Sequence, residues 1–259
     1  MTSLRRERAR RLRYKVCGWL TGSALVGWAF WWSQVDLAAL VRSGPRWRDF
    51  FTRMVPPDWS VTGVVLRSTV ETLMIALAGT ALAVVLALPL GFLAASNVTP
   101  AWIAQPVKWL LGFIRSIPLI LVAFVCVMAV GLGPFPGMLA IAFHSLGMLG
   151  KFYAEEFETA DPGIVAAIEG TGASWAQTVR YGVVPQSVPQ IFSFTVYRLE
   201  MNFRDSAVLG LVGAGGIGYY IQLYMRSFRF ERVVVLVVVV VVVVTLLDQL
   251  TFWVRRWAR

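Results

Sequence analysis

The residues best suited to chemistry stand together inside one apolar stretch, as the run YRLEMNFRD from Tyr197 to Asp205. Charged side chains inside a segment long enough to cross a bilayer are costly, so by default they serve a function. Glu200 and Arg204 are spaced i,i+4, and this spacing lets them pair on one face of a helix. The run therefore predicts a polar feature inside a membrane.

A second group on the same stretch holds Arg198, Asn202 and Asp205, which helical spacing brings close together. Arginine offers bidentate donors that suit oxyanions. We interpret both groups as the wall of a polar pathway, with His144 and Ser145 from another apolar stretch as further members. A structural ion-pair network at a bundle or dimer interface is an equal alternative, and the neighbouring carboxylates weigh against a fixed anion site.

Motifs for covalent chemistry are missing. Cys17 and Cys126 lie in or beside apolar stretches and have no metal-ligand spacing. The pattern GAGGIG at Gly213–Gly218 matches a dinucleotide fingerprint, but it follows an apolar helix rather than a strand. Gly150-Lys151 lacks the other residues of a phosphate-binding loop. We expect no catalytic residue, no metal site and no cofactor in this chain.

The composition places these residues in a membrane. The chain is 58% hydrophobic and 15% charged, with a mean hydropathy of +0.67, and this excludes an ordinary soluble domain. The net charge of +10 does not indicate a nucleic-acid partner, because much of it lies in the run Arg5–Lys15, directly before an apolar span. We expect an all-α integral membrane protein.

Six stretches are each near the ~20 residues that a bilayer demands. They must be helices, because backbone groups in lipid have to be satisfied within the segment. The basic residues before the first span and after the last, among them Arg255, Arg256 and Arg259, predict that both termini are cytoplasmic. The predicted spans are Val16–Ser33, Ser68–Ala95, Trp109–Gly131, Phe135–Tyr153, Ser187–Val212 and Val233–Phe252.

The segment between the fourth and fifth spans is polar and rich in glycine and proline, and it contains the stretch AAIEGTGASWAQTVRYGVVPQSVPQ. Asp161 and Pro162 predict a capped helix start. Gly170 and Gly172 permit a sharp bend between two short helices. Such a compact protrusion has small side chains that suit docking into another protein, although an ordinary helical loop is about equally compatible.

This segment resembles the EAA loop of ABC-importer permeases. Gly172 matches the glycine of that loop, Pro185 matches its proline, and Ala167 matches its first alanine, whereas Ala166 replaces the usual glutamate and Ile168 the second alanine. Four longer stretches resemble phosphonate-type permeases, so that the likeness covers about residues 71–256. They are TGASWAQTVRYGVVPQ, RSIPLILVAF, GLGPFPGMLAIAFHSLGMLGKFYAEEFE and VLGLVGAGGIGYYI.

The resemblance implies a six-helix, MetI-like bundle of the type I importer class with cytoplasmic coupling helices. It implies an importer subunit that moves phosphonate or a related phosphorus oxyanion across the bacterial inner membrane by alternating access. The expected partners are a second permease copy, with a homodimer favoured, two cytoplasmic ATPase subunits that bind ATP and Mg, and a periplasmic phosphonate-binding protein. This chain is then not itself an enzyme. The residues expected to couple to the ATPase are Ala166, Ala167, Glu169, Gly170, Thr171, Gly172, Ala173, Ser174 and Trp175.

We expect two regions: residues 1–67 with the basic tail, the first span and a periplasmic connector, and residues 68–259 with a five-helix core that includes the coupling loop 155–186. Other functions stay open. The same machine could carry another small solute, such as methionine or phosphite. A stand-alone secondary transporter would predict internal repeats, and an integral membrane enzyme would need a catalytic cluster.

Overall fold

The computed structural model describes residues 2–257, apart from the side chains of 2–10, 12, 13, 37, 254, 255 and 257, and this part of the chain is helical without strands. Most side chains of the basic N-terminal run, the side chain of Arg255, and all of Arg259 therefore lie outside the described residues. Two compact units are present, Met1–Arg53 and Met54–Arg259. The helices are α1 (Thr2–Trp32), α2 (Leu37–Arg42), α3 (Gly44–Thr52), η1 (Trp59–Val61), α4 (Thr62–Ala94), α5 (Ala101–Ser116), α6 (Leu119–Val130), α7 (Pro134–Glu158), α8 (Pro162–Glu169), α9 (Trp175–Thr178), η2 (Val179–Val183), α10 (Val184–Leu209), η3 (Gly210–Val212), α11 (Gly216–Arg226) and α12 (Phe230–Trp257).

The first unit consists of α1 and the short helices α2 and α3. Asp36 caps α2, because its Oδ1 accepts a hydrogen bond from the amide of Ala39 at 3.0 Å. In α3 the rings of Trp47, Phe50 and Phe51 gather within 5.6–6.4 Å of one another. This unit thus contains the first predicted span and part of the predicted connector.

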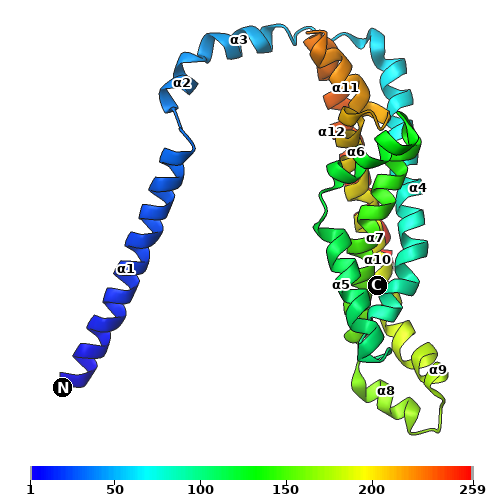
Figure 1. Ribbon diagram of the computed structural model, residues 1–259. Coiled ribbons are helices and arrows are strands. Elements are labelled where there is room, and N and C mark those ends of the chain that lie inside the picture. Colours follow the sequence, from blue (N-terminus) through cyan, green and yellow to red (C-terminus); the bar gives the residue numbers. More distant parts are fainter. Residues whose placement is uncertain (1, 258–259) are drawn as a thin grey trace. The chain divides into compact units, whose positions relative to one another are not determined.

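The second unit is a bundle in which α4, α7 and α10 run side by side (Figure 1). Small residues let α4 and α7 approach closely. A Cβ placed on Gly79 would lie 2.7 Å from Cγ2 of Ile141, and one on Gly91 would lie 2.7 Å from Cβ of Tyr153. The two central helices therefore pack through glycines, which brings their polar side chains within reach of one another.

Five of the six predicted spans each coincide with one continuous helical segment, but the third predicted span, Trp109–Gly131, is divided between α5 and α6. In the described part of the chain, two helices can cross a bilayer by length and hydropathy, Trp59–Ala94 and Phe230–Trp253, or up to four if each of two bent pairs counts as one span. The predicted third span is wrong as one straight helix, since α5 and α6 meet at 84°. Pro118 has no N–H and holds Ile117 in an extended conformation, and this ends α5.

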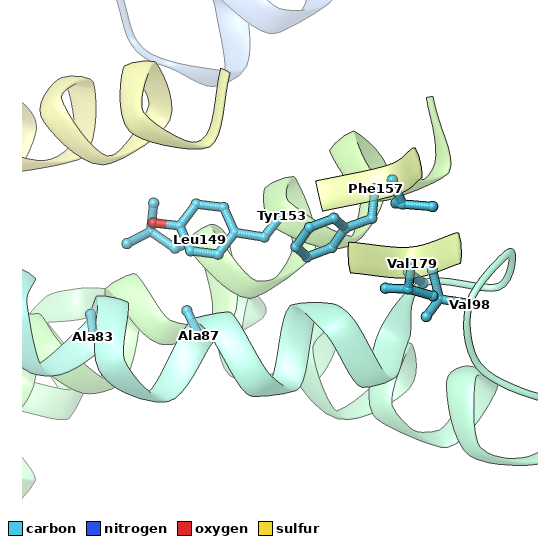
Figure 2. Packing of buried hydrophobic residues seen from close by; sticks show 9 residues of the cluster. Ala83, Ala87, Val98, Leu149, Tyr153, Phe157 and Val179 are labelled. Carbon is cyan, nitrogen blue, oxygen red and sulfur yellow. The ribbon is translucent and has the colours of Figure 1, made fainter. Parts of the chain in front are cut away.

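One end of the bundle has a tightly packed core, which Figure 2 shows from close by. Side chains of α4 and α7 meet there with Val98 of the α4–α5 loop and Val179 of η2. The hydroxyls of Tyr153 and Thr195 lie 2.5 Å apart and link this core to α10. The segment that follows α7 is therefore rooted in the bundle. The labelled residues are Ala83, Ala87, Val98, Leu149, Tyr153, Phe157 and Val179.

Candidate functional site

Residues 162–183, here called the knob, form the protrusion at this end of the bundle, at the bottom of Figure 1. The helix start was predicted correctly: Oδ1 of Asp161 accepts a hydrogen bond from the amide of Gly163 at 2.7 Å, and Pro162 occupies the first turn. Gly172 has a φ of +81°, a value that L-residues rarely adopt. Contrary to expectation, Gly170 keeps a helical φ of −61°, so the bend depends on Gly172 and not on Gly170.

Trp175 fastens the knob to the α4–α5 loop. Its Nε1 donates to the carbonyl of Val98 at 3.2 Å, and its ring lies edge-on to Phe92, with the centroids 6.3 Å apart. Ser174 starts α9 with a capping box, in which its amide donates to Oε1 of Gln177 at 2.8 Å. The second short helix of the knob therefore has a fixed orientation relative to α4.

The surface of the knob is accessible. Of the nine residues predicted to couple, only Ala173 is half-buried. The apolar side chains of Ile164 and Tyr181 are also exposed on this segment. The knob thus combines a rooted base with small and apolar groups at its surface. The eight exposed residues are Ala166, Ala167, Glu169, Gly170, Thr171, Gly172, Ser174 and Trp175.

A polar brace holds the end of α7 just before the knob. Oε1 of Glu158 accepts from Nζ of Lys108 at 2.6 Å and from the amide of Ser96 at 2.7 Å. The amide of the Asn97 side chain donates to the carbonyl of Phe157 at 2.7 Å. Partial burial raises the pKa of Glu158, but the hydrogen bonds from Lys108 and Ser96 outweigh it, and the pKa lies below its ordinary value.

The second predicted group forms a buried network between α4, α7 and α10. Nε of Arg198 donates to Oγ of Ser145 at 3.0 Å. Ser145 donates to Oδ1 of Asn202 at 3.0 Å, and Nδ2 of Asn202 donates to Oγ1 of Thr80 at 2.8 Å. Asp205 lies 3.4 Å from Nη2 of Arg198. Sequence reasoning missed Thr80, whose only signal is a hydroxyl in an apolar span.

An ion-pair cluster lies beside this network. The predicted pair of Glu200 and Arg204 is confirmed, with Oε1 and Nη2 2.6 Å apart. The same Nη2 also contacts Oδ1 of Asp248 on α12 at 2.9 Å. Asp248 was missed, although it is the one acidic residue inside the predicted sixth span. The structure therefore ties α10 to α12 through a charge that sequence reasoning assigned to α10 alone.

His144 does not join the network by hydrogen bonds. Its Nδ1 is buried and has no hydrogen-bond partner in the part of the chain that the structure describes. No group of three or more His, Cys, Asp or Glu side chains that could hold a metal ion occurs among the described residues. The structure thus brings Ser145 together with Arg198 and Asn202, and leaves His144 next to them as a separate polar group.

The glycine-rich turn lies at the opposite end of the bundle and joins α10 to α11. Gly213, Gly215 and Gly216 have φ values between +71° and +90°. The amide of Gly216 donates to Oε1 of Glu71 at 3.1 Å, and the amide of Ile217 donates to Oγ1 of Thr72 at 2.8 Å. Side chains of α4 therefore occupy the start of α11, and the glycines serve a tight chain reversal.

The comparisons with known proteins decide the identity. Residues 87–259 match the family described as binding-protein-dependent transport system inner membrane component. The chain belongs to this family. It is a permease of a binding-protein-dependent transport system, and the knob and the broken spans described above are parts of that permease.

Relatives with assigned names resemble the permease over most of its length. It is 37% identical to the phosphite transport system permease protein PtxC of Stutzerimonas stutzeri, over 86% of this chain and 81% of that protein. The putative phosphite transport system permease protein HtxC of the same organism is 36% identical, over 96% and 88%. The phosphate-import permease protein PhnE of Mycolicibacterium smegmatis is 36% identical over 96% of this chain, which spans 47% of that protein.

Solved structures confirm the predicted fold of the permease. An inward-facing MetNI methionine ABC transporter chain superposes with a TM-score of 0.69 at 20% identity, over 78% of this chain and 99% of that chain. An amino acid ABC transporter with histidines gives a TM-score of 0.66 at 16% identity, over 86% and 98%. At these identities the likeness shows the fold alone, and that fold is the all-helical, MetI-like bundle.

Proposed function

We propose that this permease carries phosphite, phosphonate or a related phosphorus oxyanion across the inner membrane. The observation that carries the proposal is the 36–37% identity to two proteins named as phosphite permeases, over 86% or more of this chain. The relative named for D-methionine transport, from Pasteurella multocida, is 25% identical over 64% of the chain. Phosphorus oxyanions are therefore favoured over methionine as cargo.

ATP would be bound with Mg and hydrolysed by separate subunits. In this assembly, two copies of the permease pair with two cytoplasmic ATPase subunits and receive cargo from a periplasmic binding protein. The knob fits the coupling role because it is accessible at its surface and rooted by Val179 and Trp175 in the packing of α4 and α7. A push on the knob would move the bundle as a rigid body, and the pathway would open alternately to the two sides. Both termini and the knob would then be cytoplasmic.

The polar residues of the network between α7 and α10 are less easily assigned to the wall of a pathway. Arg198, Asn202 and Ser145 are buried and bonded to one another, so they serve as a rigid polar layer between helices. Arg204 is more exposed and is the better candidate for contact with an anion. His144 is kept as a candidate pathway residue because it lies beside this layer.

Reconstitution tests the cargo. The permease, the ATPase and the binding protein are placed in vesicles with ATP inside, and uptake of labelled phosphite is measured. We expect ATP-dependent uptake that methylphosphonate reduces and methionine does not. Uptake of methionine in place of phosphite would contradict the cargo, and uptake without the ATPase would support a stand-alone carrier.

A further inference from the structure

The aromatic face of α3 is exposed. Trp47, Phe50 and Phe51 fall within about 100° of one another on a helix that turns 100° per residue, and their ring centroids lie 5.6–6.4 Å apart. Trp47 and Phe51 are 52% and 58% exposed, and no residue of α3 is buried. A helix of nine residues is marginal in water on its own. This face therefore needs a surface to pack against.

Two arginines flank the aromatic face. By the same helical spacing, Arg48 falls about 60° beyond one edge of the face and Arg46 about 40° beyond the other. Both are exposed, and neither has an ion-pair partner among the described residues. Asp49, on the opposite side of the helix, pairs with Arg53 at 3.0 Å. Unbalanced cations therefore border the rings, whereas the neutralised pair lies away from them.

The chain that leads into α3 starts at the end of α1, where tryptophans gather. Trp28, Trp31 and Trp32 are all exposed there. Gln34 has a φ of 49° and closes this end of the helix, because its amide donates to the carbonyl of Trp31 at 3.1 Å. Tryptophan is enriched where a span meets the membrane surface. The predicted first span therefore ends at that surface, near Trp32.

Short connections keep α2 and α3 near the same surface. Residues 33–36 join α1 to α2, so the start of α2 lies within about 18 Å of the end of α1 even if they are fully extended. Ser43 alone separates α2 from α3. Leu40 and Val41 of α2 are exposed and apolar. Both short helices thus present apolar side chains within reach of the bilayer.

We propose that α2 and α3 lie on the bilayer surface at which α1 ends, with the rings of Trp47, Phe50 and Phe51 among the lipid headgroups and Arg46 and Arg48 on the lipid phosphates. A lipid surface supplies an apolar layer for the rings and phosphates directly beside it for the cations. The guanidinium group suits phosphate because it can donate two parallel hydrogen bonds. This inference goes beyond the proposed function and does not depend on the cargo.

Spin labelling at two adjacent positions tests what the rings face. Cys17 and Cys126 are replaced by serine, and Phe51→Cys and Thr52→Cys are made separately in the full chain, in vesicles that contain phosphatidylglycerol. Both positions are exposed, but Thr52 falls about 100° from Phe51, on the polar side of α3. Phe51→Cys leaves the other two rings in place. Collisions of the nitroxide are measured with oxygen, which concentrates in lipid, and with a water-soluble nickel chelate.

We expect the ratio of oxygen to nickel collisions to be several-fold higher for Phe51→Cys than for Thr52→Cys. High access of nickel at both positions, as for a solvated connector, would overturn the proposal. So would a label at Phe51→Cys that neither reagent reaches, because the rings would then face the bundle, a second copy of the chain or another protein. The measurement needs only the inserted chain, so a failure of the proposed cargo would not affect it.

The role of the arginines is tested in the same spin-labelled chain. Arg46→Gln and Arg48→Gln are made together in the Phe51→Cys background. We expect the ratio of oxygen to nickel collisions to fall in vesicles that contain phosphatidylglycerol, and to change less in vesicles of phosphatidylcholine alone. An equal ratio with and without the two arginines in the anionic vesicles would overturn their placement on lipid phosphates.

Discussion

At the scale of single residues, Gly172 is the position where the backbone of the knob depends on one residue type. Its φ of +81° costs about 1–2 kcal/mol for an ordinary L-residue, although no atom lies within 4 Å of an added Cβ. We predict that Gly172→Val weakens ATPase binding roughly tenfold, the equivalent of about 1.4 kcal/mol, while the chain still inserts. Co-purification of the ATPase measures this.

Two controls separate backbone strain from bulk. Gly172→Asn should retain most of the binding, because asparagine tolerates a positive φ. Gly170→Ala should also retain it, because Gly170 is helical and an added Cβ would lie 3.4 Å from the Ala166 carbonyl oxygen, an ordinary contact distance. Equal loss in all three variants would show that the knob fails for reasons other than its bend.

Asn202 is the residue that connects α7 and α4 in the buried network. Asn202→Leu removes the acceptor of the Ser145 hydroxyl and the donor to Thr80, at a cost of about 1–3 kcal/mol. The midpoint temperature of thermal unfolding in detergent should fall by about 2–4 °C for each kcal/mol of lost stability. Thr245→Val is the control, because that hydroxyl is exposed and bonds only within its own helix, to Val241. An unchanged midpoint for Asn202→Leu would contradict a stabilising network.

At the scale of elements, the brace between α5 and α7 predicts a pH dependence. The pKa of Glu158 is lower in the folded chain than its ordinary value of 4.5, so the brace stabilises the fold above that pH. The stabilisation is lost as the pH falls below 4.5 and through the lowered pKa. Glu158→Gln should therefore be less stable than the parent at pH 7, and the difference should shrink in acid. Unfolding curves that stay parallel from pH 7 to pH 3 would contradict the brace.

The crossing of α10 and α11 depends on glycine in a different way. A Cβ on Gly218 would fall well inside contact distance of the Ala207 carbonyl, so Gly218→Ala must push the two helices apart. We predict a loss of about 1–3 kcal/mol, measured by thermal unfolding. Gly112→Ala on α5 meets nothing within 4 Å and should be neutral or stabilising. If both variants unfold at the same temperature, the close approach of α10 and α11 at this turn does not contribute to stability.

The elements also show what could be predicted from the sequence. Hydropathy located the long helices α1, α4, α7, α10 and α12 but not α11, and local rules located the Asp161 cap and the Glu200–Arg204 pair, because both depend on neighbours along the chain. Pro118 is the sequence signal for the break between α5 and α6. The residues on both sides of it are apolar, however, so the sequence analysis predicted one span there. The bonds of Asn202 to Thr80 and of Arg204 to Asp248 could not be predicted, since they depend on how separate helices pack.

At the scale of the whole molecule, the permease bundle has three distinct parts along its length. One end has the accessible knob, and the middle holds the buried polar network with the Arg204–Asp248 ion pair beside it. The far end closes with a glycine turn held by Glu71 and Thr72. All three parts contact α4, and we propose that movement of the knob would reach the far end through this one long helix.

The most direct test of the central claim is the side of the membrane on which the knob lies and what it touches there. Ala167→Cys on the knob and Ala39→Cys on α2 are both exposed alanine positions, compared after Cys17 and Cys126 are replaced by serine. In intact cells, a membrane-impermeant maleimide should label Ala39→Cys and spare Ala167→Cys, which should instead cross-link to the ATPase subunit. Labelling of Ala167→Cys from outside, or no ATPase cross-link in a transporter that still takes up cargo, would contradict the account.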